Sequence, residues 1–114
     1  MKAEAVRKFA LSLPDATEEP HFHFTSFRIG GKIFATMPPG DVLLHVFVPE
    51  EERQLAVQSH PDTCEVLHWG KRVIGLKIEL GMAEESFVLD LLQAAYAGKA
   101  GKGGGAGKAR KGGS

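Results

Sequence analysis

Cysteine is nearly absent from this chain, and tryptophan and tyrosine occur once each. Because Cys64 is the single cysteine, the chain can form no internal disulfide and must be held together by an apolar core. No stretch approaches the roughly 20 apolar residues that cross a bilayer, and no charged start precedes a long apolar segment. These absences predict a cytoplasmic protein without a membrane partner.

Acidic residues are missing from the end of the chain. All 14 carboxylates fall within residues 1–97, whereas residues 98–114 combine eight glycines with five cations: Lys99, Lys102, Lys108, Arg110 and Lys111. Such a segment has too little apolar surface to order itself, so residues 98–114 are expected to form a disordered basic tail. Residues 1–97 have the size of one small domain.

Three segments are expected to be helical. In residues 2–13, apolar side chains recur at spacings of three and four, and Pro14 ends the pattern. Pro49 followed by three glutamates is typical of a helix start, and this second helix runs to about Ser59. The third helix carries the apolar stripe Phe87, Val88, Leu91, Leu92, Ala95 and Tyr96. The segment between Pro14 and the first hairpin is expected to be a loop.

Two β-hairpins and a strand between them are predicted from apolar alternation. Residues 26–37 form the first hairpin, because the paired glycines at 30 and 31 readily adopt the positive φ of a two-residue turn. Residues 42–48 form a dense apolar strand, and residues 66–80 form the second hairpin. In its last strand, Ile74, Leu76, Ile78 and Leu80 are expected to face the core of an antiparallel sheet, and the other face of the sheet is expected to be wet. The order is α-β-β-β-α-β-β-α.

Several segments resemble the MmcQ/YjbR family: residues 13–22, residues 26–36, Pro61-Asp62-Thr63, His68-Trp69-Gly70 and residues 77–80. The similarity spans about Val6 to Tyr96, so it implies nothing about the structure or function of the tail. The resemblance implies a two-layer α+β domain, in which helices cover one face of an antiparallel sheet of about five strands. That fold is similar to frataxin-like (CyaY-like) and secretion-chaperone-like proteins. It also implies DNA binding through the two hairpins, described as a double wing.

Basic residues near both hairpin turns agree with DNA binding. They are Arg28, Lys32, Lys71, Arg72 and Lys77, with Trp69 beside the second turn and the five tail cations in addition. Turn-borne cations bind phosphates without reading bases, so we expect weak, salt-sensitive and largely sequence-nonspecific binding. Charged residues at turns also keep sheet edges solvated and prevent them from pairing with other strands in soluble proteins. The alternative is therefore a module that binds another protein, a peptide or itself through an edge strand or the open sheet face.

Trp69 and His21 each allow two interpretations. Trp69 could stack on an unpaired base, but a lone tryptophan more often caps a core, and we expect the latter here. His21 is the candidate functional polar residue, and the alternative is that it packs at the sheet edge. A third class of function is a small-ligand pocket lined by His21, Phe22, His45 and Trp69.

The sequence contains few of the residue patterns that are typical of metal sites or catalytic sites. His21, His23, Cys64 and His68 would permit a tetrahedral site, but the dense CxxC and HExxH patterns are absent, so no metal or cofactor is expected. The only local nucleophile–base pairs are Ser26 with His21 or His23, and Cys64 with His68. Gly30-Gly31-Lys32 links two strands and lacks the helix N-terminus of a phosphate loop. We therefore expect no enzyme.

Overall fold

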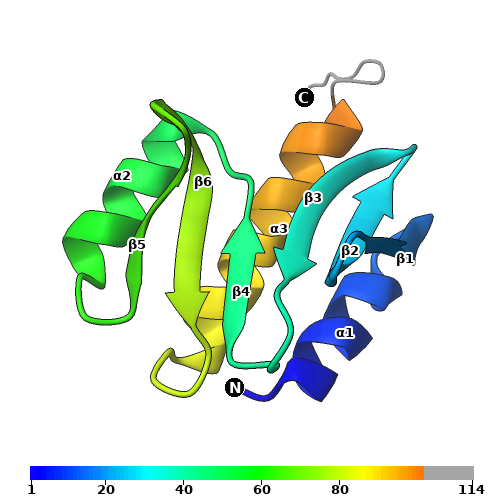
Figure 1. Cartoon of the computed structure of the whole chain (residues 1–114), viewed down its shortest axis with the longest axis horizontal. Helices are drawn as coiled ribbons and strands as arrows, with labels where there is room; N and C mark the ends of the chain where they lie inside the picture. The colour runs from blue at the N-terminus through cyan, green and yellow to red at the C-terminus, as the bar shows by residue number, and fades with distance from the viewer. Residues whose placement is uncertain (102–114) are drawn as a thin grey trace.

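The computed structural model describes residues 1–101 of the chain. Its elements in chain order are α1 (Ala3–Ser12), β1 (Ala16–His21), β2 (Phe24–Ile29), β3 (Lys32–Met37), β4 (Leu43–Val46), α2 (Glu50–Ser59), β5 (Cys64–Trp69), β6 (Arg72–Glu79) and α3 (Glu85–Gly101). The strands form one antiparallel sheet in the order β1-β2-β3-β4-β6-β5. Figure 1 views the open face of this sheet, with α3 passing behind β3 and β4. The expected α+β class is confirmed.

The sheet has one strand more than the five expected. Strand β1 occupies the segment predicted to be a loop, and there Glu19 pairs with Ser26 and Pro20 with Thr25. Acidic residues and proline are rare in strands, so propensity alone favours a loop. At the edge of a sheet, however, a proline need not donate to a further strand, and exposed charges prevent unwanted pairing. An edge position thus accommodates a sequence that a central strand would not.

Each hairpin contains a β-bulge. The β2–β3 register shifts between Phe27 and Arg28, which leaves Phe34 as the extra residue. The β5–β6 register shifts between Leu67 and His68, which leaves Ile74 as the extra residue. An extra residue breaks the period of two in side-chain direction. Ile74 therefore leaves the row of inward-facing residues and lines a cavity on the open face, contrary to the alternation expected from the sequence.

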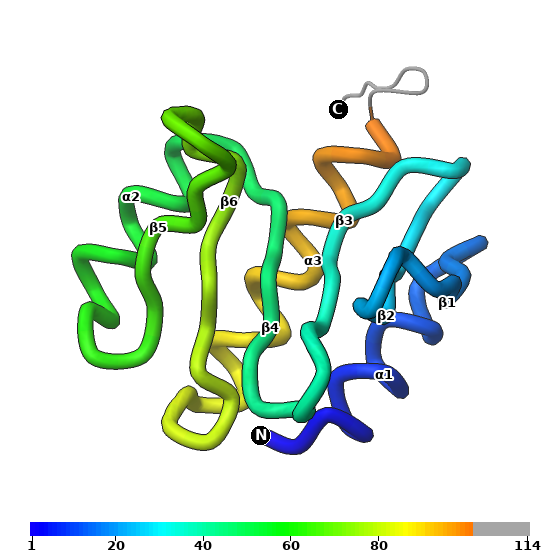
Figure 2. Tube along the Cα trace, in the orientation of Figure 1, coloured from blue at the N-terminus to red at the C-terminus, as the bar shows by residue number. Residues whose placement is uncertain are grey.

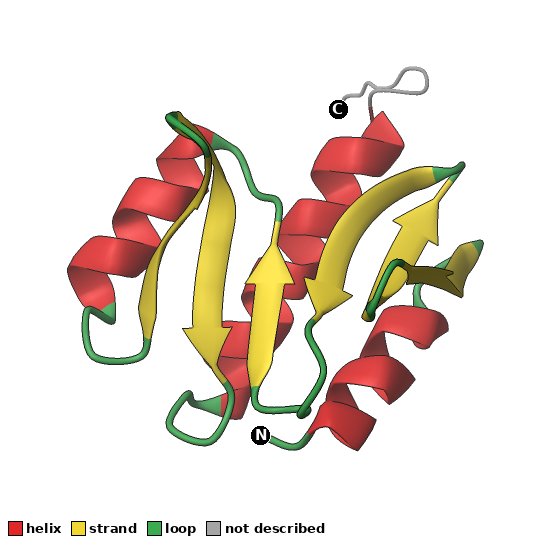
Figure 3. Cartoon of the chain, in the orientation of Figure 1, coloured by secondary structure: helices red, strands yellow, loops and turns green. Residues whose placement is uncertain are grey.

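The core lies between the sheet and the helices, as the two layers in Figure 3 show. The large, fully buried apolar side chains are Val6, Phe27, Phe34, Leu44, Val46, Leu76, Ile78, Leu80, Val88 and Leu92. Helix α2 and strand β5 contribute the smaller residues Ala56 and Cys64. The ring of Phe34 meets that of Tyr96 edge-on, with centroids 5.7 Å apart, and so joins β3 to α3.

Helix α3 is longer than the sequence suggested. It continues to Gly101, so residues 98–101, expected in the tail, form its last turn, in which Lys99 is half-buried. The other tail cations, Lys102, Lys108, Arg110 and Lys111, lie outside the described residues. Within residues 1–101, no helix is both long and apolar enough to cross a membrane.

Candidate functional site

Both hairpin turns lie at the same end of the sheet. In the antiparallel order, β2 and β5 run in the same direction, so the turns that follow them emerge together at one end (Figure 2). Strand β4 separates the two hairpins. Helix α3 also ends at this end of the molecule (Figure 1), so the basic segment that begins at Lys102 is attached there. The fold thus gathers cationic segments that are far apart in the sequence.

Three of the predicted phosphate-binding cations are exposed at these turns. Lys32 opens β3, Lys71 lies in the second turn and Arg72 opens β6. None of the three forms an ion pair with any residue in the described part of the chain. Their charges are therefore available to a polyanion that approaches this end of the sheet.

The two remaining body cations named from the sequence have internal partners. Arg28 donates from Nε to Ser26 Oγ at 3.0 Å and from Nη2 to the Pro20 carbonyl oxygen at 3.4 Å, and so ties β2 to β1. Lys77 lies on the open face of β6, next to the edge strand β5, with Nζ 3.3 Å from Glu65 Oε1. Arg28 thus pairs with Ile33 beside the first turn but has its guanidinium held against β1, and Lys77 lies away from both turns.

An apolar cavity of about 470 Å³ opens on the helix-free face between the two hairpins. The apolar side chains that line its interior come from both hairpins and from the end of β4: Phe24, Ile33, Phe47, Leu67 and Ile74. The volume lies within the range of small-molecule sites. A contiguous exposed apolar patch on a soluble protein often marks a site that binds a ligand or a partner.

Two strongly exposed aromatic side chains flank the cavity. Phe22, in the β1–β2 turn, is 88 % exposed, and Trp69, at the end of β5, is 74 % exposed. The expectation that Trp69 caps the core is therefore wrong. Trp69 is the last residue of an edge strand and lines the cavity on the open face, so its ring lies on the side of the sheet away from the core. Phe22 has a φ of 60°, a left-handed conformation that is costly for a bulky residue.

The polar groups of the cavity are three histidines and a threonine: His21, Thr36, His45 and His68. Thr36 Oγ1 lies 3.5 Å from His45 Nδ1. Burial lowers the pKa of His45, and the Lys77 ammonium lowers it further, so His45 is neutral at neutral pH. His21, Phe22, His45 and Trp69, which the sequence offered as the lining of a pocket in the third class of function, line this one cavity.

The lowered pKa of His45 predicts a loss of stability in mild acid. The unfolded chain takes up the proton first, near the ordinary histidine pKa of about 6.5, so the free energy of unfolding should fall as pH drops below this value. The loss ends once pH passes the lower pKa of the folded state. At its steepest, His45 can contribute no more than about 1.4 kcal/mol per pH unit.

Denaturant unfolding between pH 7 and pH 5 tests this prediction. The variant His45→Gln should show a shallower decline than the wild type, because it lacks the titrating ring. His23→Gln is the matched control, since His23 is exposed and lines no part of the cavity. Equal slopes for the wild type and His45→Gln would contradict the assignment.

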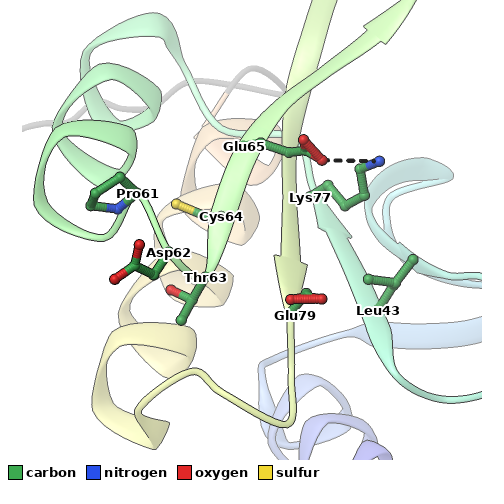
Figure 4. Close-up of a pocket in the computed structure, with 8 residues that line it drawn as sticks. All are labelled: Leu43, Pro61, Asp62, Thr63, Cys64, Glu65, Lys77 and Glu79. Carbon is green, nitrogen blue, oxygen red and sulfur yellow. Dashed lines mark ion pairs between the residues drawn. The ribbon is translucent and has the colours of Figure 1, made fainter.

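A second cavity, of about 390 Å³, lies at the opposite end of the sheet (Figure 4). Asp62, Glu65 and Glu79 line it, and Lys77 is the only cation among its lining residues, already paired with Glu65 in Figure 4. Carboxylates outnumber cations here, so this end of the sheet repels a polyanion. The two ends of the sheet therefore differ in electrostatic character.

The candidate nucleophiles and metal ligands are not assembled. Cys64 Sγ donates to the Ala56 carbonyl oxygen at 3.4 Å under α2, and burial raises the pKa of its thiol, whereas His68 lines the cavity on the open face. The hydroxyl of Ser26 is buried and donates to the Glu19 carbonyl oxygen at 2.7 Å. In the stretch from 1 to 101, no three His, Cys, Asp or Glu side chains are grouped to hold a metal ion.

Sequence reasoning missed the apolar interior of the cavity. The open face was expected to be wet, yet Phe47 and Leu67 line it beside Ile74. One signal was available: residues 42–48 are almost continuously apolar, which is typical of a strand that is covered on both faces. The bulge that turns Ile74 outward leaves no comparable local signal.

Comparison with known proteins places the chain in a family. The sequence model of the YjbR family matches residues 11–97, a span that includes both hairpins and every residue lining the open-face cavity. No curated protein sequence matches significantly. The fold is similar to the crystal structure of Deinococcus radiodurans protein DR2400, described with the domain DUF419, at a TM-score of 0.77 and 20% identity over 91% of this chain and 82% of that one. The chain therefore belongs to the YjbR family.

Proposed function

We propose that this protein is a nucleic-acid-binding module that holds a phosphate backbone at the end of the sheet where both hairpin turns lie. The observation that carries the proposal is the placement of Lys32, Lys71 and Arg72, which come from different hairpins but lie exposed at one end of a single sheet. Cations grouped in this way bind phosphates independently of base sequence. Binding is therefore weak and largely nonspecific.

The acidic residues constrain the direction of approach. Helix α2 begins at the same end of the molecule with Glu50, Glu51 and Glu52, but it lies on the helix side of the sheet (Figure 1). The second cavity, also acidic, lies at the far end of the open face. A polyanion is thus favoured only at the turns, from the open side, and its affinity falls steeply with salt.

The edge strands do not favour the alternative of peptide binding by strand addition. Strand β1 has an exposed carboxylate at Glu19 and a proline at position 20, both of which discourage a further strand. At the other edge, β5 carries Glu65 and ends at Trp69, where the chain turns into β6. The open face therefore remains the better candidate surface.

Salt dependence of binding to a mixed-sequence DNA duplex tests the proposal. Each phosphate contact contributes a slope of about 0.9 to the plot of log K against log salt. Replacing both Lys71 and Arg72 by alanine should flatten this slope by about 1 to 2. Ending the chain after Gly101, which keeps α3 intact, should flatten it by at most about 4, because four cations are removed.

The matched control replaces Lys2 and Lys8 by alanine. This variant loses the same charge, but from exposed positions on and beside α1, so its slope should equal that of the wild type. Absence of binding by the full chain at low salt would refute the proposal. If the slope responded only to removal of the tail, the folded domain would make no contact of its own, and the hairpin assignment would be wrong.

A further inference from the structure

Phosphate contacts at the turns leave the open-face cavity without a role. Its lining is largely apolar, and it is flanked by two aromatic rings that face solvent, Phe22 and Trp69. Exposed aromatic rings on a sheet surface provide stacking platforms for planar groups. The cavity is therefore suited to a flat, largely apolar group rather than to a charged one.

The charge around the cavity indicates what this flat group is attached to. None of the described residues that line the cavity is a carboxylate. Trp69 is followed within three residues by Lys71 and Arg72, both exposed and without an ion-pair partner in residues 1–101. A planar ring with an adjacent negative charge matches this combination of apolar cavity and cationic rim.

Hydrogen-bonding groups inside the cavity match the edge of such a ring. Thr36 Oγ1 and His45 Nδ1 lie 3.5 Å apart among apolar side chains, and the other ring nitrogen of His45 remains to serve a ligand as a donor or an acceptor. A nucleobase carries donors and acceptors at its edge and an aromatic face on each side. In a nucleic acid it is linked through its sugar to phosphate, and it is accessible only when it is unpaired.

We propose that the cavity binds an unpaired nucleobase, so that the protein prefers single-stranded to duplex nucleic acid. The phosphates on either side of that base then contact Lys71 and Arg72. This inference rests on the proposed function, because it assumes that the turns hold the backbone. It adds the site of the base and the strandedness of the partner.

Tryptophan fluorescence provides a direct measurement, since Trp69 is the only tryptophan in the chain. The probes are an oligo(dT) of about 12 nucleotides and a duplex of the same length, both at low salt. Oligo(dT) should quench the emission of Trp69 because a thymine stacks on its ring. The duplex should bind through the turns and leave the emission unchanged.

Variants of the flanking aromatics separate stacking from charge. Phe22→Ala and Trp69→Ala should each weaken oligo(dT) binding about fivefold to 150-fold, measured by anisotropy of labelled DNA, while binding to the duplex is unchanged. Trp69→Phe should restore most of the oligo(dT) affinity because it keeps a ring. Leu55→Ala is the control: it removes an exposed apolar side chain from α2, outside this cavity.

The outcomes distinguish the two proposals. If both nucleic acids bind with salt dependence, but neither aromatic substitution affects oligo(dT) and Trp69 emission does not change, the base site is refuted and the phosphate site stands. If neither oligo(dT) nor the duplex binds at low salt, the proposed function fails, and the base site fails with it. Quenching together with the selective loss of oligo(dT) binding supports both.

Discussion

Replacing Leu76 by alanine should lower the free energy of unfolding by about 2 to 5 kcal/mol. Leu76 is fully buried on β6, where it pairs with Val46 of β4 and Val66 of β5. The loss combines the transfer free energy of the deleted carbons with the cost of a cavity that the surrounding strands cannot close. Small domains have a total stability of about 5 to 15 kcal/mol, so the effect is a large fraction of it. Denaturant unfolding at neutral pH measures the change.

Leu55→Ala is the matched control for this experiment. It deletes the same atoms, but Leu55 is 59 % exposed on α2, so the change in free energy should stay within about 0.5 kcal/mol. Equal destabilisation by the two substitutions would show that Leu76 does not lie in the core. It would also contradict the assignment of the Leu76 side chain, which follows the bulge in β6, to the face of the sheet that packs against the helices.

Gly75→Ala should be destabilising although it adds a single methyl group. A Cβ at position 75 would overlap the carbonyl oxygen of Val46 and lie 3.1 Å from Cδ1 of Phe47. The backbone oxygen belongs to a paired central strand and cannot move without separating β4 from β6. We expect a cost near the upper end of the usual overpacking range of about 1 to 3 kcal/mol. In a domain of this size, each kcal/mol lowers Tm by about 4 to 8 °C.

Gly81→Ala is the control for the glycine substitution. Among the described residues, no heavy atom lies within 4 Å of a Cβ built at Gly81, and its φ is not positive. The added methyl group should therefore be neutral, or stabilise by up to about 1 kcal/mol through the unfolded chain. A thermal melt of Gly75→Ala that coincides with the wild type would contradict the close approach of β4 to β6.

Local patterns account for much of the fold. Apolar spacing predicts the first and third helices, Pro49 with the glutamates after it predicts the second, and the glycines at 30 and 31, with φ of 59° and 81°, predict the first hairpin. The positions of Lys32, Lys71 and Arg72 at turns follow from the same reasoning, because each lies within two residues of a turn glycine in the sequence. These features depend on residues within a few positions of one another, so one sequence is sufficient to predict them.

The missed features each depend on a partner that is distant in the sequence. Strand β1 forms because its backbone pairs with the free edge of β2, although its own composition favours a loop. The outward position of Ile74 depends on a bulge whose register is set by pairing with β5. The exposure of Trp69 depends on which helices reach that corner of the sheet.

The sequence by itself determined the helices, the two hairpins and the cations at the turns, since local periodicity and turn chemistry specify these. Its motifs, rather than its periodicity, identified the YjbR family. Only the tertiary structure decided that both turns share one end of the sheet and that an apolar cavity lies between them. The physical reason is that the cavity is lined from β1–β2, β3, β4 and β5–β6 together. Its shape arises from strand order and two bulges, which are set by pairing between distant segments rather than by neighbouring residues.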